Sequence, residues 1–165
     1  MKIKIFLFLL AGIFVIGVIF SKPLITHVKV ILFISEQFPQ IPVVADLITP
    51  ASEKPKPALI LAMGVKTQEK DKVILLNFAQ TLARLGYAVF WPRLEILDRG
   101  VSSFEDPETF IKSFEYLEAI SAVDKNRISF VGFSVGSSIA LVAAENPRIN
   151  EKLHSLVFFG GYYSL

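Results

Sequence analysis

The stretch ISFVGFSVGSSIALVAA, residues 128–144, contains the pattern that decides the fold. Its first four residues form a short apolar run, as expected for a strand that is buried on both faces. Its last residues are small and apolar, and they predict a helix that ends at about Asn146-Pro147. GFSVG (132–136) lies between the two, so we expect Ser134 at a sharp turn from the end of a strand into a helix.

Such a turn needs glycine at 132 and 136, because larger side chains would crowd the neighbouring strand and helix. It presents the Ser134 hydroxyl at the sheet edge and aims the N–H groups of the helix N-terminus at any developing negative charge. The pattern G-x-S-x-G arises by chance in roughly one chain in twenty of this length. The apolar strand before it and the small-residue helix after it favour a nucleophile at Ser134 over an accidental match.

Strand and helix patterns alternate from residue 58 onward. We expect strands at 58–62, 87–91, 128–131 and 154–159, and helices at 72–85, from 106 onward and from 135 to about 145. This order predicts a mostly parallel sheet with right-handed crossovers and flanking helices. Ligands of such sheets bind at the carboxyl ends of the strands, and GFSVG lies at one of these ends.

Local signals set the expected boundaries of these elements. The helix at 72–85 places Ile74, Phe78, Leu82 and Leu85 at helical spacing, with Gly86 as its C-terminal cap. Pro92 is expected to end the strand that begins at residue 87. Asp106-Pro107 begins a helix that carries Phe110, Phe114 and Leu117 on one face, and 124–126 forms a turn.

Taken together, residues 58–165 resemble the α/β-hydrolase superfamily, and within it the dienelactone-hydrolase-like and esterase-like members. The most specific stretch is VDKNRISFVGFSVGSSIALVAA (123–144). The resemblance implies a partial α/β-hydrolase fold with Ser134 as nucleophile and the Val135 N–H as one oxyanion-hole donor. The second donor of the family comes from the loop MGVK (63–66), where Gly64 or Val65 is the matching position.

The sequence departs from the family pattern in two ways. Dienelactone hydrolases use a cysteine nucleophile, and this chain has no cysteine. The oxyanion loop has Met63-Gly64 where a His-Gly pair is common. The implied substrate is therefore a small-molecule ester or related acyl compound rather than a dienelactone.

No histidine of the chain is well placed to act as base for Ser134. The family order is Ser, then Asp or Glu, then His, and only Glu145, Glu151 and His154 follow Ser134. His154 precedes a strand, so about 16 Å separates it from the opposite sheet edge, whereas a base needs contact near 3 Å. His27 lies beside the apolar N-terminus. The two glutamates are expected to be solvated.

We therefore expect this chain to be an incomplete, inactive N-terminal portion of a membrane-anchored serine hydrolase, with the catalytic acid and base on sequence beyond it. The alternative is a non-catalytic, membrane-tethered α/β binding module. Arg93 and Glu95 follow a strand end and either line the pocket or, as we favour, form a solvent-facing ion pair.

Residues 1–22 predict a single-pass membrane anchor. The uncharged apolar run 5–21 is near the lower limit for crossing about 30 Å of hydrocarbon, and Lys4 and Lys22 flank it. A cleaved signal peptide is the alternative, but VIGVIFSKP (15–23) offers no convincing cleavage site. Lysines on both flanks leave the orientation open.

Residues 23–57 are expected to form a juxtamembrane segment and a proline-rich connector. LITHVKVILFI (24–34) is too short to span again, so it lies along the interface or begins the globular domain. Residues 37–57 contain five of the nine prolines, which favours an extended connector over a long helix. The hydrolase-like domain then occupies 58–165.

Composition excludes several other functions. The net charge is +2 and the basic residues are scattered, so we expect no nucleic-acid partner. The absence of cysteine excludes disulfides and thiolate zinc sites. No metal-ligand cluster and no phosphate-binding loop with a Walker lysine occurs, so we expect no metal and no cofactor.

Overall fold

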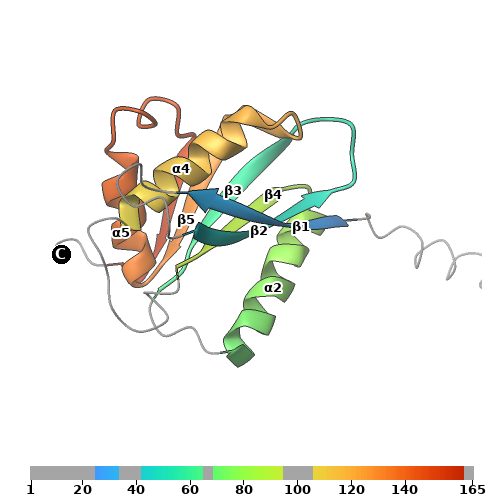
Figure 1. Cartoon of the computed structure of the whole chain (residues 1–165), viewed down its shortest axis with the longest axis horizontal. Helices are drawn as coiled ribbons and strands as arrows, with labels where there is room; N and C mark the ends of the chain where they lie inside the picture. Colours follow the sequence, from blue (N-terminus) through green and yellow to red (C-terminus); the bar gives the residue numbers. More distant parts are fainter. Residues whose placement is uncertain (1–24, 34–41, 65–68, 95–105, 162–165) are drawn as a thin grey trace, which may run out of the picture.

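The computed structural model describes residues 25–33, 42–64, 69–94 and 106–161. These residues form a sheet with helices on both faces (Figure 1). The elements are β1 (Ile25–Phe33), β2 (Pro42–Pro50), β3 (Lys56–Ala62), α2 (Glu69–Arg84), β4 (Ala88–Arg93), α4 (Asp106–Ala119), β5 (Val123–Phe133), α5 (Val135–Ala144) and β6 (Ser155–Phe159).

The six strands of the sheet follow the order β1-β2-β4-β3-β5-β6. β4, β3, β5 and β6 run parallel, and β2 joins β4 and β1 in antiparallel pairs. Parallel neighbours need a crossover, and α2, α4 and α5 supply the three crossovers. The predicted mostly parallel sheet with flanking helices is therefore confirmed, with an antiparallel flank added to it.

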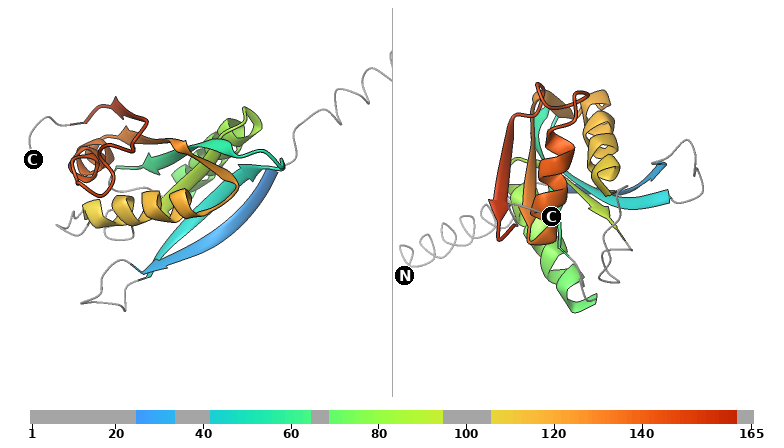
Figure 2. Two further views of the ribbon diagram at one scale, coloured as in Figure 1. Left: turned by 90° about the horizontal axis from the view of Figure 1, so that it is seen from above. Right: turned by 90° about the vertical axis from the view of Figure 1, so that its left-hand side faces the viewer.

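The helices divide between the two faces of the sheet, with α2 on one face and α4 and α5 on the other (Figures 1 and 2). The α4–α5 side buries a large aromatic core that includes Phe90, Phe110, Phe114 and Phe130. The predicted inward face of the helix from Asp106 is thereby confirmed. On the opposite side the core is smaller, and α2 approaches the sheet through Ala79 and Ala83.

The expected connector at 37–57 is wrong, because residues 42–50 form β2 of the sheet. For residues 24–34, the alternative that they begin the globular domain is the one that agrees with the structure, where residues 25–33 form β1. The pairing of β1 with β2 is regular along its whole length, from Ile25 opposite Pro50 to Phe33 opposite Pro42. The prolines did exclude a helix, but Pro42 and Pro50 stand at the two ends of β2, where a missing N–H costs little. The sheet therefore begins at Ile25, not at residue 58.

Two local expectations also need correction. β4 continues through Pro92 to Arg93, because β3 pairs with β4 only as far as Phe90. Pro92 thus has only β2 beside it. Ile74 of α2 and Leu85, directly after α2, are exposed. The buried face of the helix is centred on Ala79 and Ala83, because small side chains let the helix lie close to the sheet.

The predicted membrane anchor at 1–22 lies outside the described residues. Within the described ranges, no helix is both long enough and apolar enough to cross a bilayer.

Candidate active site

Ser134 occupies a strained turn between β5 and α5. Its backbone has φ 54° and ψ −131°, and among the described residues no other non-glycine residue has positive φ. Such a conformation costs about 1–3 kcal/mol and persists only where its surroundings enforce it. Here the Ser134 N–H donates to the carbonyl of Phe159 at the end of β6 (2.8 Å), and the Ser134 carbonyl accepts from Ser137 N–H (3.0 Å).

The two glycines of GFSVG are required by close backbone contacts. A Cβ at Gly136 would lie 2.2 Å from the carbonyl oxygen of Ala62, and one at Gly132 would lie 2.5 Å from the Cα of Ser137. Both distances are shorter than any real side chain tolerates. Gly132 lets α5 approach β5, and Gly136 lets α5 approach the end of β3, as expected from the sequence.

The loop after β3 lies against Ser134. A Cβ placed on Gly64 would be 3.0 Å from the Cβ of Ser134 and 3.4 Å from its Oγ. Gly64 is thus beside the hydroxyl, at the position that the resemblance assigned to an oxyanion-hole donor. Val65, the other residue expected there, lies outside the described residues.

Val135 is the first residue of α5, so its N–H has no acceptor one turn earlier in the helix. Among the described residues we find no hydrogen-bond partner for this N–H or for the Ser134 hydroxyl. Ser134 is also exposed at the sheet edge. This turn, called the Ser134 corner below, therefore places an exposed hydroxyl next to the Val135 N–H at the N-terminus of a helix, an arrangement suited to anionic oxygen.

Neither histidine is close to Ser134. The His154 N–H donates to the carbonyl of Ile128 (2.9 Å), near the start of the paired part of β5, about 17 Å of strand from Phe133. His27 is on β1, four strand spacings, or about 19 Å, from β5. Of the expected solvated acids, Glu145 follows the end of α5 and is exposed, as is Glu151.

A buried acid that the sequence analysis missed lies on the antiparallel flank. Asp46 of β2 is 0% exposed and accepts hydrogen bonds from His27 Nε2 (2.8 Å) and Arg93 Nε (2.6 Å). The Arg93 guanidinium also lies over the ring of Trp91, 5.0 Å from its centroid. Arg93 therefore pairs with Asp46, and Glu95 lies outside the described residues. A single acid within the apolar run VVADLI (43–48) was the available signal.

No group of three or more His, Asp or Glu side chains in the described parts of the chain is arranged to hold a metal ion.

The arrangement of the sheet and its helices is shared with solved structures. The chain aligns with a dienelactone hydrolase-like promiscuous phosphotriesterase, P91, from metagenomic libraries (TM-score 0.63, 18% identity, 83% of this chain). It also aligns with the esterase Est22 (TM-score 0.68, 14% identity, 85% of this chain). A third match is esterase B from Lactobacillus rhamnosis (TM-score 0.55, 19% identity, 81% of this chain).

The chain has a partial α/β-hydrolase fold. The matched structures are longer than this chain, which spans 59% of the length of P91, 45% of Est22 and 46% of esterase B. The sequence matches no protein-family model and no curated protein sequence. At these identities, the shared property is the α/β-hydrolase fold.

Proposed function

We propose that this chain is the nucleophile-bearing part of a membrane-anchored serine hydrolase that acts on esters or related acyl compounds. The observation that carries the proposal is the strained backbone of Ser134, held between Gly64 and the N-terminus of α5. Glycine adopts positive φ without the steric penalty of serine, so a serine held in this conformation needs a reason beyond the backbone. Strained residues of this kind cluster at functional sites, and a nucleophilic role for the hydroxyl supplies such a reason.

In the proposed reaction, the Ser134 Oγ attacks the carbonyl carbon of the acyl substrate. The oxygen that becomes negative is stabilised by the Val135 N–H and by the N–H of Gly64 or Val65 in the loop after β3. The alcohol or other leaving group departs with a proton, and water then releases the acid from the acyl-serine. Both steps need a general base, and we propose that this base stands on polypeptide beyond residue 165.

The distances support a base from elsewhere. Both histidines are many ångströms from Ser134, whereas proton transfer requires hydrogen-bond contact. The matched hydrolase structures also contain polypeptide that has no counterpart in this chain, since the chain spans 59% or less of each of the three described above.

Ester hydrolysis tests the proposal. The turnover of p-nitrophenyl butyrate is measured for the 165-residue chain and for the chain extended by the coding sequence that follows residue 165. The chain alone should give a rate close to that of its Ser134→Ala variant, because a serine without its base retains only binding and oxyanion stabilisation. The extended chain should be active, and Ser134→Ala should lower its kcat by at least about a thousandfold.

The matched control is Ser155→Ala, because Ser155 is an exposed serine at the opposite sheet edge, and it should leave the rate unchanged. Extended-chain activity that survives Ser134→Ala would contradict the proposed nucleophile. An extension that lacks both activity and a histidine would favour the non-catalytic binding module. Strong Ser134-dependent activity in the 165-residue chain would place the base within it, and His154→Ala would be the next variant.

A further inference from the structure

The first described residue, Ile25, lies at the sheet edge opposite Ser134. It stands opposite Pro50 in the β1–β2 pair, and β2 pairs with β4 so that Ile48 is opposite Val89. Continuing that register brings Pro50 level with Tyr87, just before the start of β4. Ile25 and Tyr87 are therefore at the amino edge of the parallel strands, about 10 Å apart across two strand spacings.

The chain reaches this edge directly from the apolar run 5–21. Only residues 22–24 separate Ser21 from Ile25, and a fully extended chain covers about 14 Å in those four steps. If residues 5–21 are embedded in a bilayer, the amino edge of the sheet must stand within about that distance of the membrane surface.

The amino edge carries two exposed apolar side chains. Leu85, directly after the end of α2, is 71% exposed, and Tyr87 is 36% exposed. The backbone fixes both positions, because Gly86 has φ 104° and the N–H groups of Gly86 and Tyr87 donate to the last turn of α2. Leucine and tyrosine on a fixed turn are suited to the boundary between lipid headgroups and acyl chains.

Cationic side chains surround these two residues. Arg84 precedes Leu85, Lys56 begins the adjacent strand β3, and Lys54 is exposed in the loop before it. The acid Glu53 directly precedes Lys54 in the sequence. Farther along the same edge, Lys125 adds a charge, while Arg127 donates a hydrogen bond to Asp124 and thereby lowers the pKa of that carboxyl, so this pair is neutral overall. Near Leu85 and Tyr87 the charge is therefore positive, which favours contact with anionic headgroups. The exposed acid Glu151 stands at the far end of this edge, in the loop before β6.

Exposed apolar side chains also occur on β6 and at the start of α2. Those positions lie away from the edge at which the chain enters from residue 24, so a membrane-embedded run 5–21 does not bring them to the lipid surface. Val73, which is 60% exposed, is about 18 Å from Leu85 along α2.

We propose that the amino edge of the sheet rests on the lipid surface, with Leu85 and Tyr87 inserted at the headgroup boundary. This inference rests on the membrane anchor of the proposed function. The corner at Ser134 then faces away from the bilayer, because β5 runs from the amino edge to that corner. The substrate would reach Ser134 from the aqueous phase, which favours water-soluble acyl compounds over membrane lipids.

Lipid-quenching of tryptophan fluorescence tests this orientation. The full chain carrying Leu85→Trp, or separately Tyr87→Trp, is reconstituted into vesicles of phosphatidylcholine and phosphatidylglycerol whose acyl chains are brominated near the headgroup. The added fluorescence should fall by about half relative to unbrominated vesicles, because an indole at the headgroup boundary contacts the bromines. Trp91, the only native tryptophan, is buried, and its signal is subtracted with the parent chain.

The matched control is Val73→Trp, which adds an equally exposed indole at the other end of α2 and should show no quenching. Equal quenching of Trp at 73 and at 85, or quenching at neither 85 nor 87 in a vesicle-bound chain, would overturn the proposed orientation. A chain that does not sediment with the vesicles would instead contradict the membrane anchor itself. Neither outcome depends on the reactivity of Ser134, so the hydrolase proposal is tested separately.

Discussion

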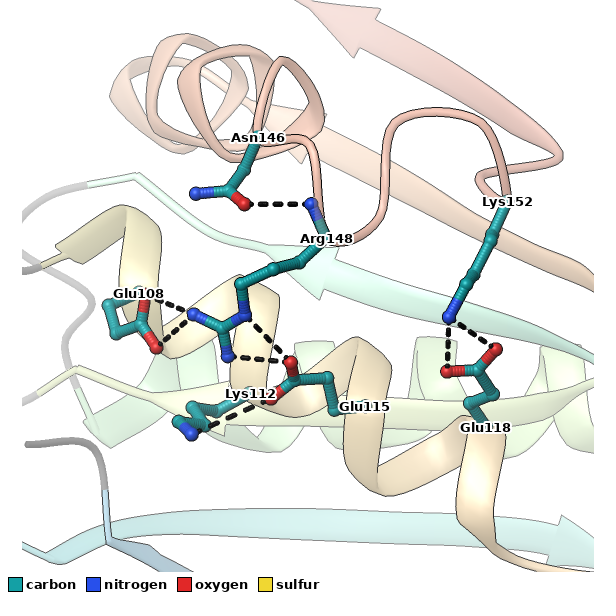
Figure 3. A network of polar contacts seen from close by, with 7 residues as sticks. All are labelled: Glu108, Lys112, Glu115, Glu118, Asn146, Arg148 and Lys152. Atoms are coloured by element: carbon teal, nitrogen blue, oxygen red, sulfur yellow. Dashed lines mark hydrogen bonds and ion pairs between the residues drawn. The ribbon is translucent and has the colours of Figure 1, made fainter.

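The two ends of α5 are held in place by different kinds of contact. At its N-terminus, Gly136 brings the helix backbone against the carbonyls of Ala62 and Met63, with no side chain between. Beyond its C-terminus, the loop is tied to α4 by long charged side chains, chiefly Arg148 (Figure 3). Close backbone contact fixes a position to within fractions of an ångström, whereas solvent-exposed ion pairs adapt. The end that carries Ser134 has the less adaptable support.

The ion-pair network nonetheless has good geometry. Arg148 donates from Nε and one terminal nitrogen to Glu115 (2.8 and 2.6 Å) and from the other to both oxygens of Glu108 (2.8 and 3.0 Å). Hydrogen bonds to Glu115, and then to Glu108, raise the pKa of Arg148 above its ordinary value. A second pair, Lys152 with Glu118, continues the network along α4 (Figure 3).

Gly136→Ala should have the largest effect of the changes considered. The added methyl group would lie 2.2 Å from one backbone oxygen and 2.4 Å from another, so α5 must move away from β3. We expect a loss of about 3 kcal/mol or more in the free energy of unfolding. Urea unfolding followed by Trp91 fluorescence measures it.

The control for this change is Gly86→Ala. Gly86 has φ 104°, and a Cβ added there would have no atom within 4 Å, so alanine strains the backbone without a clash and should cost about 1 kcal/mol. Equal losses at positions 86 and 136 would mean that backbone conformation, not close contact, sets the requirement for glycine at the Ser134 corner.

Asp46→Asn, which removes a buried charge, should lower the free energy of unfolding by an intermediate amount. The Asp46 side chain is 0% exposed, while those of its partners His27 and Arg93 are 32% and 28% exposed. The neutral amide keeps the shape but weakens hydrogen bonds to a charged partner, for a loss of about 2 kcal/mol. The partners retain access to water, which limits the penalty. Urea unfolding measures this difference, and Asp124→Asn, in an exposed pair with Arg127, should change stability little.

Arg148→Ala should have the smallest effect despite removing the most hydrogen bonds. The Arg148 side chain is 40% exposed, so water and salt screen its attraction to both glutamates. We expect a loss of about 1 kcal/mol at low ionic strength, and less in high salt. Arg148→Lys keeps the charge but lacks the paired donors of the guanidinium, so its free energy of unfolding should lie between those of the parent chain and Arg148→Ala. A loss as large as that of Gly136→Ala, and insensitive to salt, would contradict the contrast between the two ends of α5.

Much of the fold was predictable because its signals are local. The strand before GFSVG, the glycines at 132 and 136 and the helix start at Asp106-Pro107 each follow from short-range sterics or capping, and the structure places them as expected. The buried face of α2 was harder to predict, because Ile74 and Ala79 both lie on apolar parts of the helix. Only the sheet beneath decides that the alanines face inward.

The sequence by itself determined the alternating strands and helices, the turn at Ser134 and the absence of a nearby histidine, since these depend on residue type and spacing. Tertiary structure alone decided that β1 and β2 join the sheet, because pairing between strands distant in sequence leaves no local mark. It likewise brought Asp46 to Arg93 and Phe159 to the N–H of Ser134. The pairing of β2 with β4, the contact of Asp46 with Arg93 and that of Phe159 with Ser134 each join residues more than twenty positions apart in the chain, so only the register of the sheet creates them.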